Sequence, residues 1–439
     1  MNTVNVVFKS LYACAHQCGF CHVLQIPRNI SYMSTADVKK TFDDIERIFA
    51  GRRVELEMSG GEFTMRKDSG ELIKDLRSRQ IRWSSLVLDT MGVFLADERL
   101  ASELGSLFDK ANVSVHACDP ALHAAISSSR TPFEELEAGL TNIFRFFPAV
   151  FTNTSINKFN YDRLPDIARF ILQTRKKANR DVPLYCLFYL PVYREYGPAN
   201  KENSRRIQGE DNTDFLPPPE SLAQVRERFA KTRALLATHG VAAVLRDFNL
   251  PACIYHAVSG TFPENSFGLP NLMTDCYFTD FEHPLSEMHT LESVYPSKSR
   301  RTKTSECERC AVEPVCPGIP EVWLERGYEA APVKDSEYAA AFPIQLLNQT
   351  LFGLFHDAVR MRFLFSRIQL DWKALADSFF DLLRGEADTI AAARDRISHL
   401  SATDRAITLA RYLRIQGDPD SLLFAALIEE EIGKMAQLV

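Results

Sequence analysis

The sequence predicts an α/β fold built on parallel strands, on the basis of two observations. From the start of the chain to about residue 250, short β-rich runs alternate with amphipathic helical stretches. Strand–helix alternation implies parallel strands joined by helical crossovers, which gives an α/β barrel or a doubly wound sheet. The chain has 439 residues, more than one core usually serves, so we expect two or more domains.

The expected elements of the first region follow one another in regular alternation. Helices are recognised by apolar residues at three- and four-residue spacing, such as Ile45, Ile48 and Phe49 in the first helix, and Gly240 closes the last helix. We expect strands at 4–8, 54–58, 86–91, 113–117, 151–156 and 184–190, helices at 35–50, 69–78, 97–108, 133–147, 161–174 and 218–239, and a further strand at 242–248.

Three cysteines lie close together just after the first expected strand. Cys14, Cys18 and Cys21 stand in the run Cys-Ala-His-Gln-Cys-Gly-Phe-Cys, and no fourth cysteine lies nearby. Three thiolates on one short loop can hold an iron–sulfur cluster, because soft sulfur ligands suit iron. Such a cluster takes four ligands, so one iron is left open for a group that is not protein. The alternative is a zinc site, which normally shows paired Cys-x-x-Cys spacing and four closed ligands.

A glycine pair and a glutamate follow the second expected strand. The run is Met-Ser-Gly-Gly-Glu-Phe-Thr at 58–64, with Gly60, Gly61 and Glu62 at its centre. Glycines let a backbone approach a ligand closely, and a carboxylate complements an ammonium group. Together with the three cysteines, and with the aromatic Phe20 before the last of them, this order of motifs resembles the radical SAM superfamily.

That resemblance implies a fold, a cofactor and a reaction. The fold is a partial (β/α)6 TIM barrel of the radical SAM type, with its site at the C-terminal ends of the strands. The three cysteines would bind a 4Fe-4S cluster, with S-adenosylmethionine at its open iron. Gly60, Gly61 and Glu62 would bind the methionine amino group of that cofactor. Reductive cleavage would then give a 5′-deoxyadenosyl radical that abstracts hydrogen from a substrate.

Further site residues follow from their places near strand ends in such a barrel. Ser114, Asn153 and Ser155 lie in the fourth and fifth strands, where related enzymes contact the ribose and carboxylate of the cofactor, although each is equally an ordinary strand-end polar residue. Cys118 and Cys186 lie on strands outside the cysteine groups. Cys118, at a C-terminal strand tip, is the candidate catalytic residue, a hydrogen-atom donor to a substrate radical; a small buried hydrophobe is the alternative.

A second group of cysteines follows the barrel, in a region rich in loops. It resembles the C-terminal extension called SPASM, or its shorter relative twitch, which carries auxiliary iron–sulfur clusters. A full SPASM motif has more than the five cysteines found here, and Pro320 stands where another is expected. We expect at least one auxiliary 4Fe-4S cluster, with a zinc knuckle as the alternative. Its ligands would be Cys253, Cys307, Cys310 and Cys316, with Cys276 as a substitute ligand or a spare.

From about residue 336 the signals are helical and metal-ligand types are sparse. Apolar residues recur at helical spacing in stretches expected at 344–365, 372–384, 389–398, 402–413 and 421–438. We therefore expect three domains: a radical SAM partial barrel at 1–240, a SPASM/twitch-like auxiliary cluster region at 241–334 and a helical C-terminal domain at 335–439.

Composition and charge limit the classes of function. The net charge of −6 argues against a broad nucleic-acid surface, and no uninterrupted apolar stretch is long enough to span a bilayer. No signal peptide is visible before the cysteine loop. Eight of the ten cysteines fall in or near the two groups, which indicates metal ligation in a reducing cytoplasm rather than disulfides. We expect a cytoplasmic protein with no membrane and no nucleic-acid partner.

The leading functional hypothesis is an oxidative radical SAM maturase that modifies a peptide or protein side chain, by cross-link formation or oxidation. It rests on the SPASM/twitch-like region, which resembles that of peptide-modifying enzymes. The runner-up is a radical SAM dehydrogenase or rearrangement enzyme acting on a small metabolite, such as a sugar or amino-acid derivative. A third hypothesis is a non-catalytic iron–sulfur or zinc binding module. For the enzymes we expect a peptide or small-molecule substrate and a flavodoxin- or ferredoxin-type electron donor as partners.

Overall fold

The chain forms two compact units. Residues 3–246 and 276–299 belong to the first, and 247–275 and 300–439 to the second. The division into three domains expected from the sequence stays a prediction. The computed structural model describes residues 3–21, 32–128, 131–191, 215–246, 250–260, 275–280, 284–287, 301–310, 316, 318–334, 343, 346–347, 350–351, 370, 372–388 and 390–436.

A sheet of mainly parallel strands forms the centre of the first unit. Its order is β7-β6-β5-β4-β3-β2-β1-β8, so neighbours in the sheet follow the chain from β1 to β7. All neighbouring pairs from β1 to β7 are parallel. Parallel strands in chain order, joined by helices, are the arrangement of an α/β barrel, so the expected fold class is confirmed. The strands are β1 (Thr3–Lys9), β2 (Arg53–Ser59), β3 (Arg82–Thr90), β4 (Lys110–Ser114), β5 (Val150–Ser155), β6 (Leu184–Tyr189), β7 (Ala242–Leu245) and β8 (Asp275–Thr279).

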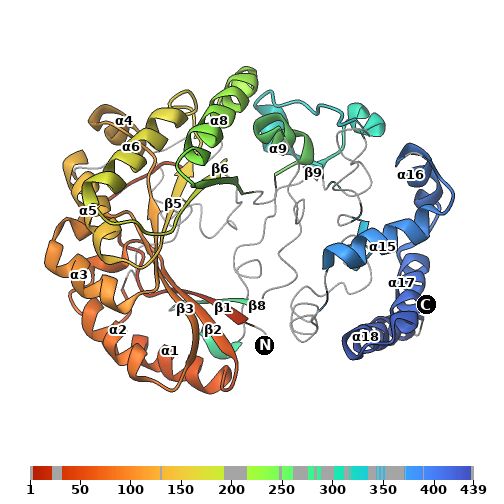
Figure 1. The fold of residues 1–439 in the computed structure, drawn as a ribbon, viewed down its shortest axis with the longest axis horizontal. Helices are drawn as coiled ribbons and strands as arrows, with labels where there is room; N and C mark the ends of the chain where they lie inside the picture. Colours follow the sequence, from red (N-terminus) through yellow and green to blue (C-terminus); the bar gives the residue numbers. More distant parts are fainter. Residues whose placement is uncertain are drawn as a thin grey trace. The chain divides into compact units, whose positions relative to one another are not determined.

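Helices cover the outer face of this sheet (Figure 1). Their starts are set by local side chains: Ser34 accepts a hydrogen bond from Asp37 N–H before the first helix, and Asp97 accepts from Arg99 and Leu100 before the third. The helices are α1 (Thr35–Ile48), α2 (Ser69–Ser78), α3 (Glu98–Leu107), α4 (Pro120–Ser127), α5 (Phe133–Phe146), α6 (Leu164–Ala178) and α8 (Leu222–Ala237), with short 3-10 turns η2 (Phe63–Met65), η3 (Val93–Ala96), η5 (Pro219–Ser221) and η6 (Leu285–Glu287).

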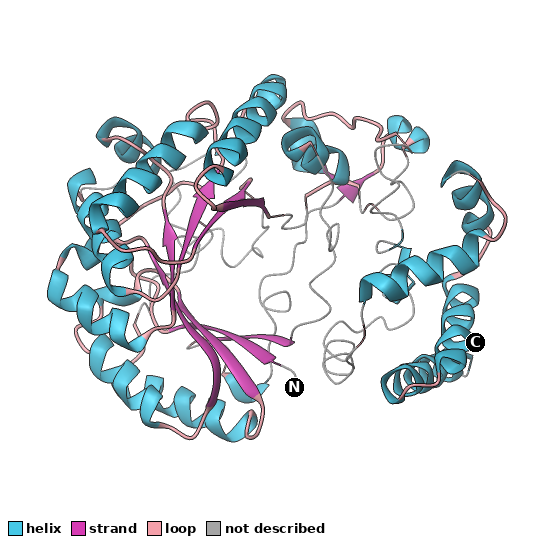
Figure 2. Ribbon diagram, viewed as in Figure 1, coloured by secondary structure: helices cyan, strands magenta, loops and turns pink. Residues whose placement is uncertain are grey.

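The sheet is curved and has helices on its outer face (Figure 2). Its two faces differ in the chemistry of their side chains. Successive side chains of a strand point to opposite faces. On the helix-covered face the side chains are apolar and fully buried, as with Leu56, Leu88 and Phe188. On the inner face they are largely polar and partly exposed, as with Glu57 and Asp89. The outer face therefore supplies the core, and the inner face is available for polar chemistry.

The position of the fourth strand corrects one sequence expectation. The strand expected at 113–117 is found as β4, which already ends at Ser114, so the expectation that Cys118 lies at a strand tip is wrong. The chain leaves the sheet because Asp119 caps α4, accepting a hydrogen bond from Leu122 N–H at 2.9 Å, with Pro120 in its first turn. This short helix is not anticipated from the sequence. Cys118 lies in the connection just before it.

The second unit combines short strands with helices. The helices expected at 372–384, 389–398, 402–413 and 421–438 are confirmed, whereas most of the stretch at 344–365 lies outside the described residues. Among the described helices, none is long and apolar enough to cross a membrane. The elements are α9 (Ala252–Ser259), β9 (Arg301–Thr302), η7 (Ser305–Arg309), β10 (Ile319–Pro320), α11 (Glu321–Glu325), α15 (Trp372–Arg384), α16 (Ile390–Ser398), α17 (Ala402–Gln416) and α18 (Pro419–Ala436).

The contrast between the two faces predicts the outcome of one pair of substitutions. Leu88→Ala should lower the free energy of unfolding by about 2–5 kcal/mol, because it opens a cavity between the sheet and its helices. Leu187→Ala removes the same atoms from the partly exposed inner face and should cost clearly less. Urea denaturation followed by circular dichroism measures both. Equal losses would contradict this division of the sheet.

Candidate functional site

The cysteine loop is fastened to the sheet by the glycine pair that follows β2. Gly61 N–H donates to the Leu11 carbonyl and Glu62 N–H donates to the Ala13 carbonyl, both at 2.9 Å. A Cβ atom on Gly61 would lie 2.0 Å from the Ala13 oxygen, and Gly60 has a φ of +124°. A larger residue at either place would push the loop away. The glycines therefore serve a close approach of two backbones, which lays the cysteines over the end of β2.

The three thiols of the loop affect one another electrostatically. Cys18 is buried, and Cys14 and Cys21 are partly buried. Burial, together with the charges of Glu62 and Cys21, raises the pKa of Cys14 to about 12. Burial and the two other thiols likewise raise the pKa of Cys18 well above its usual value. Three thiolates here repel one another unless a cationic centre binds them, so the donor set fits an iron–sulfur cluster.

The carboxylate of Glu62 is fully buried and satisfied by hydrogen bonds within the unit. Its Oε1 accepts from the Thr64 hydroxyl and, at 2.8 Å, from the Thr90 hydroxyl, and its Oε2 accepts from Met91 N–H at 2.6 Å. Burial raises the pKa of Glu62, and these hydrogen bonds oppose that rise. Cys14 Sγ lies 3.7 Å from Met91 Sδ. Glu62 therefore joins the ends of β2 and β3 beside the first cysteine, a role that the sequence does not reveal.

His116 connects the ends of β4 and β5 to the cysteine loop. Its ring packs edge-on against Phe20, with 5.0 Å between ring centroids, and its Nδ1 accepts from Ser155 N–H at 3.1 Å. Burial, and then His16 and His123, lower the pKa of His116 to about 3, so the neutral ring carries its proton on Nε2.

Asn160, which the sequence analysis misses, strengthens this connection. Its amide donates to the carbonyls of His116 and Ser155 at 2.9 and 2.8 Å. The Asn-x-x-Asn spacing of Asn157 and Asn160 after β5 is a signal that could have indicated it, because Asn157 N–H donates to Asn160 Oδ1 at 2.8 Å.

Phe215 packs directly on the cysteine loop. A Cβ atom on Gly19 would lie 1.8 Å from the ring of Phe215. The rings of Phe20 and Phe159 lie 6.3 and 6.0 Å from the same ring, and Lys158 N–H donates to the Phe215 carbonyl at 2.9 Å. These aromatic side chains cover the loop with apolar surface, which suits a centre that must be kept from water.

A chain of hydrogen bonds crosses the inner face of the sheet from β5 to β2. Asn153 Nδ2 donates to Asn112 Oδ1 at 2.6 Å, and Asn112 Nδ2 donates to Asp89 Oδ1 at 2.8 Å. Glu57 is hydrogen-bonded to Asp89 in turn, and burial together with the charge of Asp89 raises the pKa of Glu57 well above its usual value. The raised pKa favours the protonated form of Glu57, which can donate to Asp89.

This row of hydrogen bonds determines which side-chain atom of Asn153 is left to bind a ligand. Asn112 turns its amide nitrogen toward Asp89 and its oxygen toward Asn153. The Oδ1 atom of Asn153 is then buried without a hydrogen-bond partner among the described residues. A ligand hydroxyl or N–H would satisfy it. Ser114 is the register neighbour of Asn153, and Ser155 lies on the same face two residues along, so the structure places these three predicted residues together.

Cys118 has charged side chains near its sulfur and also packs against an apolar cluster. Its Sγ lies 3.5 Å from Arg163 Nη2 and 3.8 Å from Asp119 Oδ2. It also packs against apolar side chains at the start of α4, as does Phe20 of the cysteine loop. The candidate hydrogen-atom donor thus shares an apolar cluster with the cysteine loop although it lies beyond the strand.

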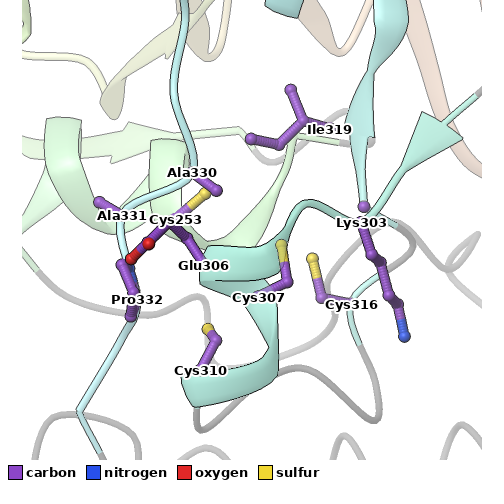
Figure 3. A pocket seen from close by; sticks show the side chains of 11 residues that line it. Cys253, Lys303, Glu306, Cys307, Cys310, Cys316, Ile319, Ala330, Ala331 and Pro332 are labelled. Atoms are coloured by element: carbon purple, nitrogen blue, oxygen red, sulfur yellow. The ribbon is translucent and has the colours of Figure 1, made fainter.

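Four cysteines of the second unit line one pocket, shown in Figure 3. Cys253 comes from α9, Cys307 from η7, Cys310 follows η7, and Cys316 precedes β10. Cys253 is far from the others in sequence, so the fold brings together the set that the sequence analysis names. Four sulfur donors around one pocket fit an iron–sulfur cluster by their chemistry.

Two observations qualify this set of ligands. Within the described ranges no group of three or more His, Cys, Asp or Glu side chains forms a site that could hold a metal ion. Cys276 lies in β8, in the first unit, and its side chain is outside the described residues. Its role as a substitute ligand stays a prediction.

The comparison with protein families concerns the first unit. The family model described as the radical SAM superfamily matches residues 9–171. Residues 9–171 thus carry the sequence pattern of the radical SAM superfamily. The matched residues include the cysteine loop, the glycine pair and the polar chain from Glu57 to Asn153, whereas Phe215 and the second group of cysteines lie outside them.

A curated relative matches part of this chain. It is the probable GTP 3',8-cyclase of Methanocaldococcus jannaschii, 27% identical over 162 residues, which cover 36% of this chain and 51% of the relative. The chain therefore spans about half the length of that relative.

Solved structures with a similar fold cover more of the chain. Native anSMEcpe with bound AdoMet is 12% identical and superposes with a TM-score of 0.50, over 82% of this chain and 99% of that one. SuiB of Streptococcus suis bound to S-adenosylmethionine is 14% identical with a TM-score of 0.47, over 76% of this chain and 77% of that one. The similarity to anSMEcpe is one of fold.

The surroundings of Cys118 predict an unusual response to pH. Burial raises the pKa of its thiol to about 11, while Arg163 acts in the opposite direction. Because only the thiolate is alkylated, labelling of Cys118 by iodoacetamide should keep accelerating up to about pH 11, as followed by peptide mass spectrometry. Arg163→Gln should raise this pKa and slow labelling further. An inflection near pH 8.5, the usual value for a thiol, would contradict the assignment.

Proposed function

We propose that the chain is an oxidative radical SAM enzyme that modifies a peptide or protein side chain by cross-link formation or oxidation. A 4Fe-4S cluster on Cys14, Cys18 and Cys21, with S-adenosylmethionine on its open iron, supplies a 5′-deoxyadenosyl radical when both are bound. The observation that carries the proposal is the cysteine loop itself: three thiols, fastened to the end of β2 by two backbone hydrogen bonds from Gly61 and Glu62.

The protein's own residues would bind and orient the cofactor. Gly60, Gly61 and Glu62 would hold its methionine amino group. Ser114, Asn153 and Ser155 would contact its ribose and carboxylate, and Asn153 Oδ1 is suited to a ribose hydroxyl because it lacks a donor among the described residues. A carbon radical abstracts hydrogen with little intrinsic selectivity, so such positioning sets which atom reacts.

Cys118 is the proposed hydrogen-atom donor for products in which a substrate radical regains hydrogen. Its raised pKa keeps the sulfur protonated at neutral pH, which is the form that can give a hydrogen atom. The Arg163 guanidinium, 3.5 Å from the sulfur, holds it in place beside the apolar cluster that Phe20 also contacts.

The second cysteine site supports the oxidative character. We propose that Cys253, Cys307, Cys310 and Cys316 hold an auxiliary 4Fe-4S cluster, since all four line one pocket. Four protein ligands leave no open iron, which suits electron transfer better than substrate binding. A peptide substrate is proposed because the SPASM/twitch-like region resembles that of peptide-modifying enzymes.

A small-metabolite substrate is the second candidate. One observation favours it: a curated relative of this chain is named for a reaction of GTP. In that case the enzyme would be a dehydrogenase or a rearrangement enzyme, and the inner polar face from Glu57 to Asn153 would contact its substrate.

Loss of one cysteine of the loop tests the radical reaction. Cys18→Ala should abolish release of 5′-deoxyadenosine from S-adenosylmethionine by the reduced, anaerobically reconstituted protein, as measured by liquid chromatography. Cys186→Ala is the matched control, because this buried thiol lies on the outer face of β6 and should leave release within about twofold. Unchanged release in Cys18→Ala would refute the proposal.

Loss of one cysteine of the second site tests the division of roles. Cys310→Ala should keep some release of 5′-deoxyadenosine but uncouple it from product formation, because the first site is intact. Iron and sulfide analysis should give about eight irons per chain in the unsubstituted protein and about four in a variant that has lost one cluster. Complete loss of release in Cys310→Ala, with the first cluster still present, would contradict separate roles.

A further inference from the structure

Two thiols of the second cysteine site lie within hydrogen-bond distance of groups that can donate to them. Val333 N–H donates to Cys310 Sγ at 3.3 Å. The hydroxyl of Thr304 lies 3.7 Å from Cys307 Sγ, within the range of a hydrogen bond that involves sulfur. A donor aimed at sulfur stabilises negative charge on it.

Cys253 and Cys316 also interact with neighbouring polar or charged groups of the chain. Burial raises the pKa of Cys253 to about 12, and a hydrogen bond from the backbone of Ala331 opposes that rise. Arg301, on β9, donates from Nη1 to the Gly318 carbonyl at 3.0 Å, two residues beyond Cys316. Burial lowers the pKa of Arg301, and its electrostatic interaction with Cys316 opposes that change.

Among the charged side chains near the pocket, Arg301 is the one expected to act most strongly on the sulfurs. Lys303 and Glu306 line the pocket and carry opposite charges, whereas Arg301 contacts the lining through the Gly318 carbonyl. The Lys303 side chain is exposed to water. Glu306 forms an ion pair with Arg309, whose side chain is 72% exposed to water. An exposed pair acts weakly because water screens it, whereas a partly buried guanidinium acts at short range through a medium of lower polarity.

We propose that this set of donors, with Arg301 as its charged member, raises the reduction potential of the cluster held by the four cysteines. The inference rests on the auxiliary cluster of the proposed function. Adding one electron to such a cluster increases its negative charge by one unit, and donors and positive charge around the sulfurs stabilise that reduced form. The site is thereby built to accept an electron rather than to give one.

The test is a redox titration of the auxiliary cluster alone. Replacing Cys14, Cys18 and Cys21 by alanine in the full-length chain removes the other cluster, so that electron paramagnetic resonance reports only the auxiliary one during stepwise reduction with dithionite. In that background Arg301→Gln should lower the ratio of reduced to oxidised cluster at a fixed potential at least tenfold. For a one-electron couple that corresponds to a shift of about 59 mV toward more negative potential.

Three further variants make the result specific. Arg301→Lys keeps the charge and should restore most of the potential. Arg309→Gln removes the same charge from an exposed neighbour and should change the ratio less than twofold. Thr304→Val removes one hydroxyl without changing size and should shift the potential in the same direction by a smaller amount, which keeps the test open if Arg301→Gln fails to assemble a cluster.

The possible failures are distinguishable. An assembled cluster whose potential is the same with and without Arg301 and Thr304 would overturn the inference and leave the proposed function standing. Absence of any iron and sulfide in the chain lacking Cys14, Cys18 and Cys21 would instead overturn the auxiliary site of the proposed function.

Discussion

The contact between two backbones, the glycine pair after β2 and the chain just before Cys14, is the constraint on which the arrangement of the first unit depends. Gly61 and Glu62 donate to the Leu11 and Ala13 carbonyls, so the cysteine loop cannot move without breaking the continuation of β2. The Glu62 carboxylate extends the constraint to β3 by accepting from Thr90 and Met91. The loop is thus positioned by rigid elements, which is what a reactive centre with little selectivity of its own requires.

The sheet separates stability from chemistry. Its outer face is apolar, buried and covered by helices, whereas its inner face carries a hydrogen-bonded chain in which one carboxylate, Asp89, sets the orientation of two amides. A change on the outer face therefore affects folding first. A change at Asp89 or Asn112 would leave the core intact and reverse the hydrogen-bonding character of Asn153. In the second cysteine site, too, polar groups of the backbone and side chains are held in place around the sulfurs.

The sequence predicts the fold well because alternation of strands and helices is a property of local pattern. It fails near the end of β4: Val115 N–H still donates to the Asn153 carbonyl of β5, but the buried apolar pattern continues to Ala117, beyond the strand. The alternation of apolar residues indicates which side chains are buried, but it does not indicate where the pairing between strands ends. Spacing indicates Cys14, Cys18 and Cys21, and Cys307, Cys310 and Cys316, because each group is close in sequence, whereas Cys253 comes from a distant helix. Glu57, Asp89 and Asn112 escape notice because each is an ordinary polar strand residue until the register of three strands brings them into one line.

The packing of Phe215 on Gly19 has a consequence for how this sequence can vary. The ring occupies the space that any side chain at position 19 would need, so the two positions are coupled sterically although they are far apart in the chain. Across descendants of this sequence, a side chain at 19 should be accepted only in lineages where 215 has already become small. The order of the two changes is therefore constrained: a smaller residue at position 215 must come before a side chain at position 19.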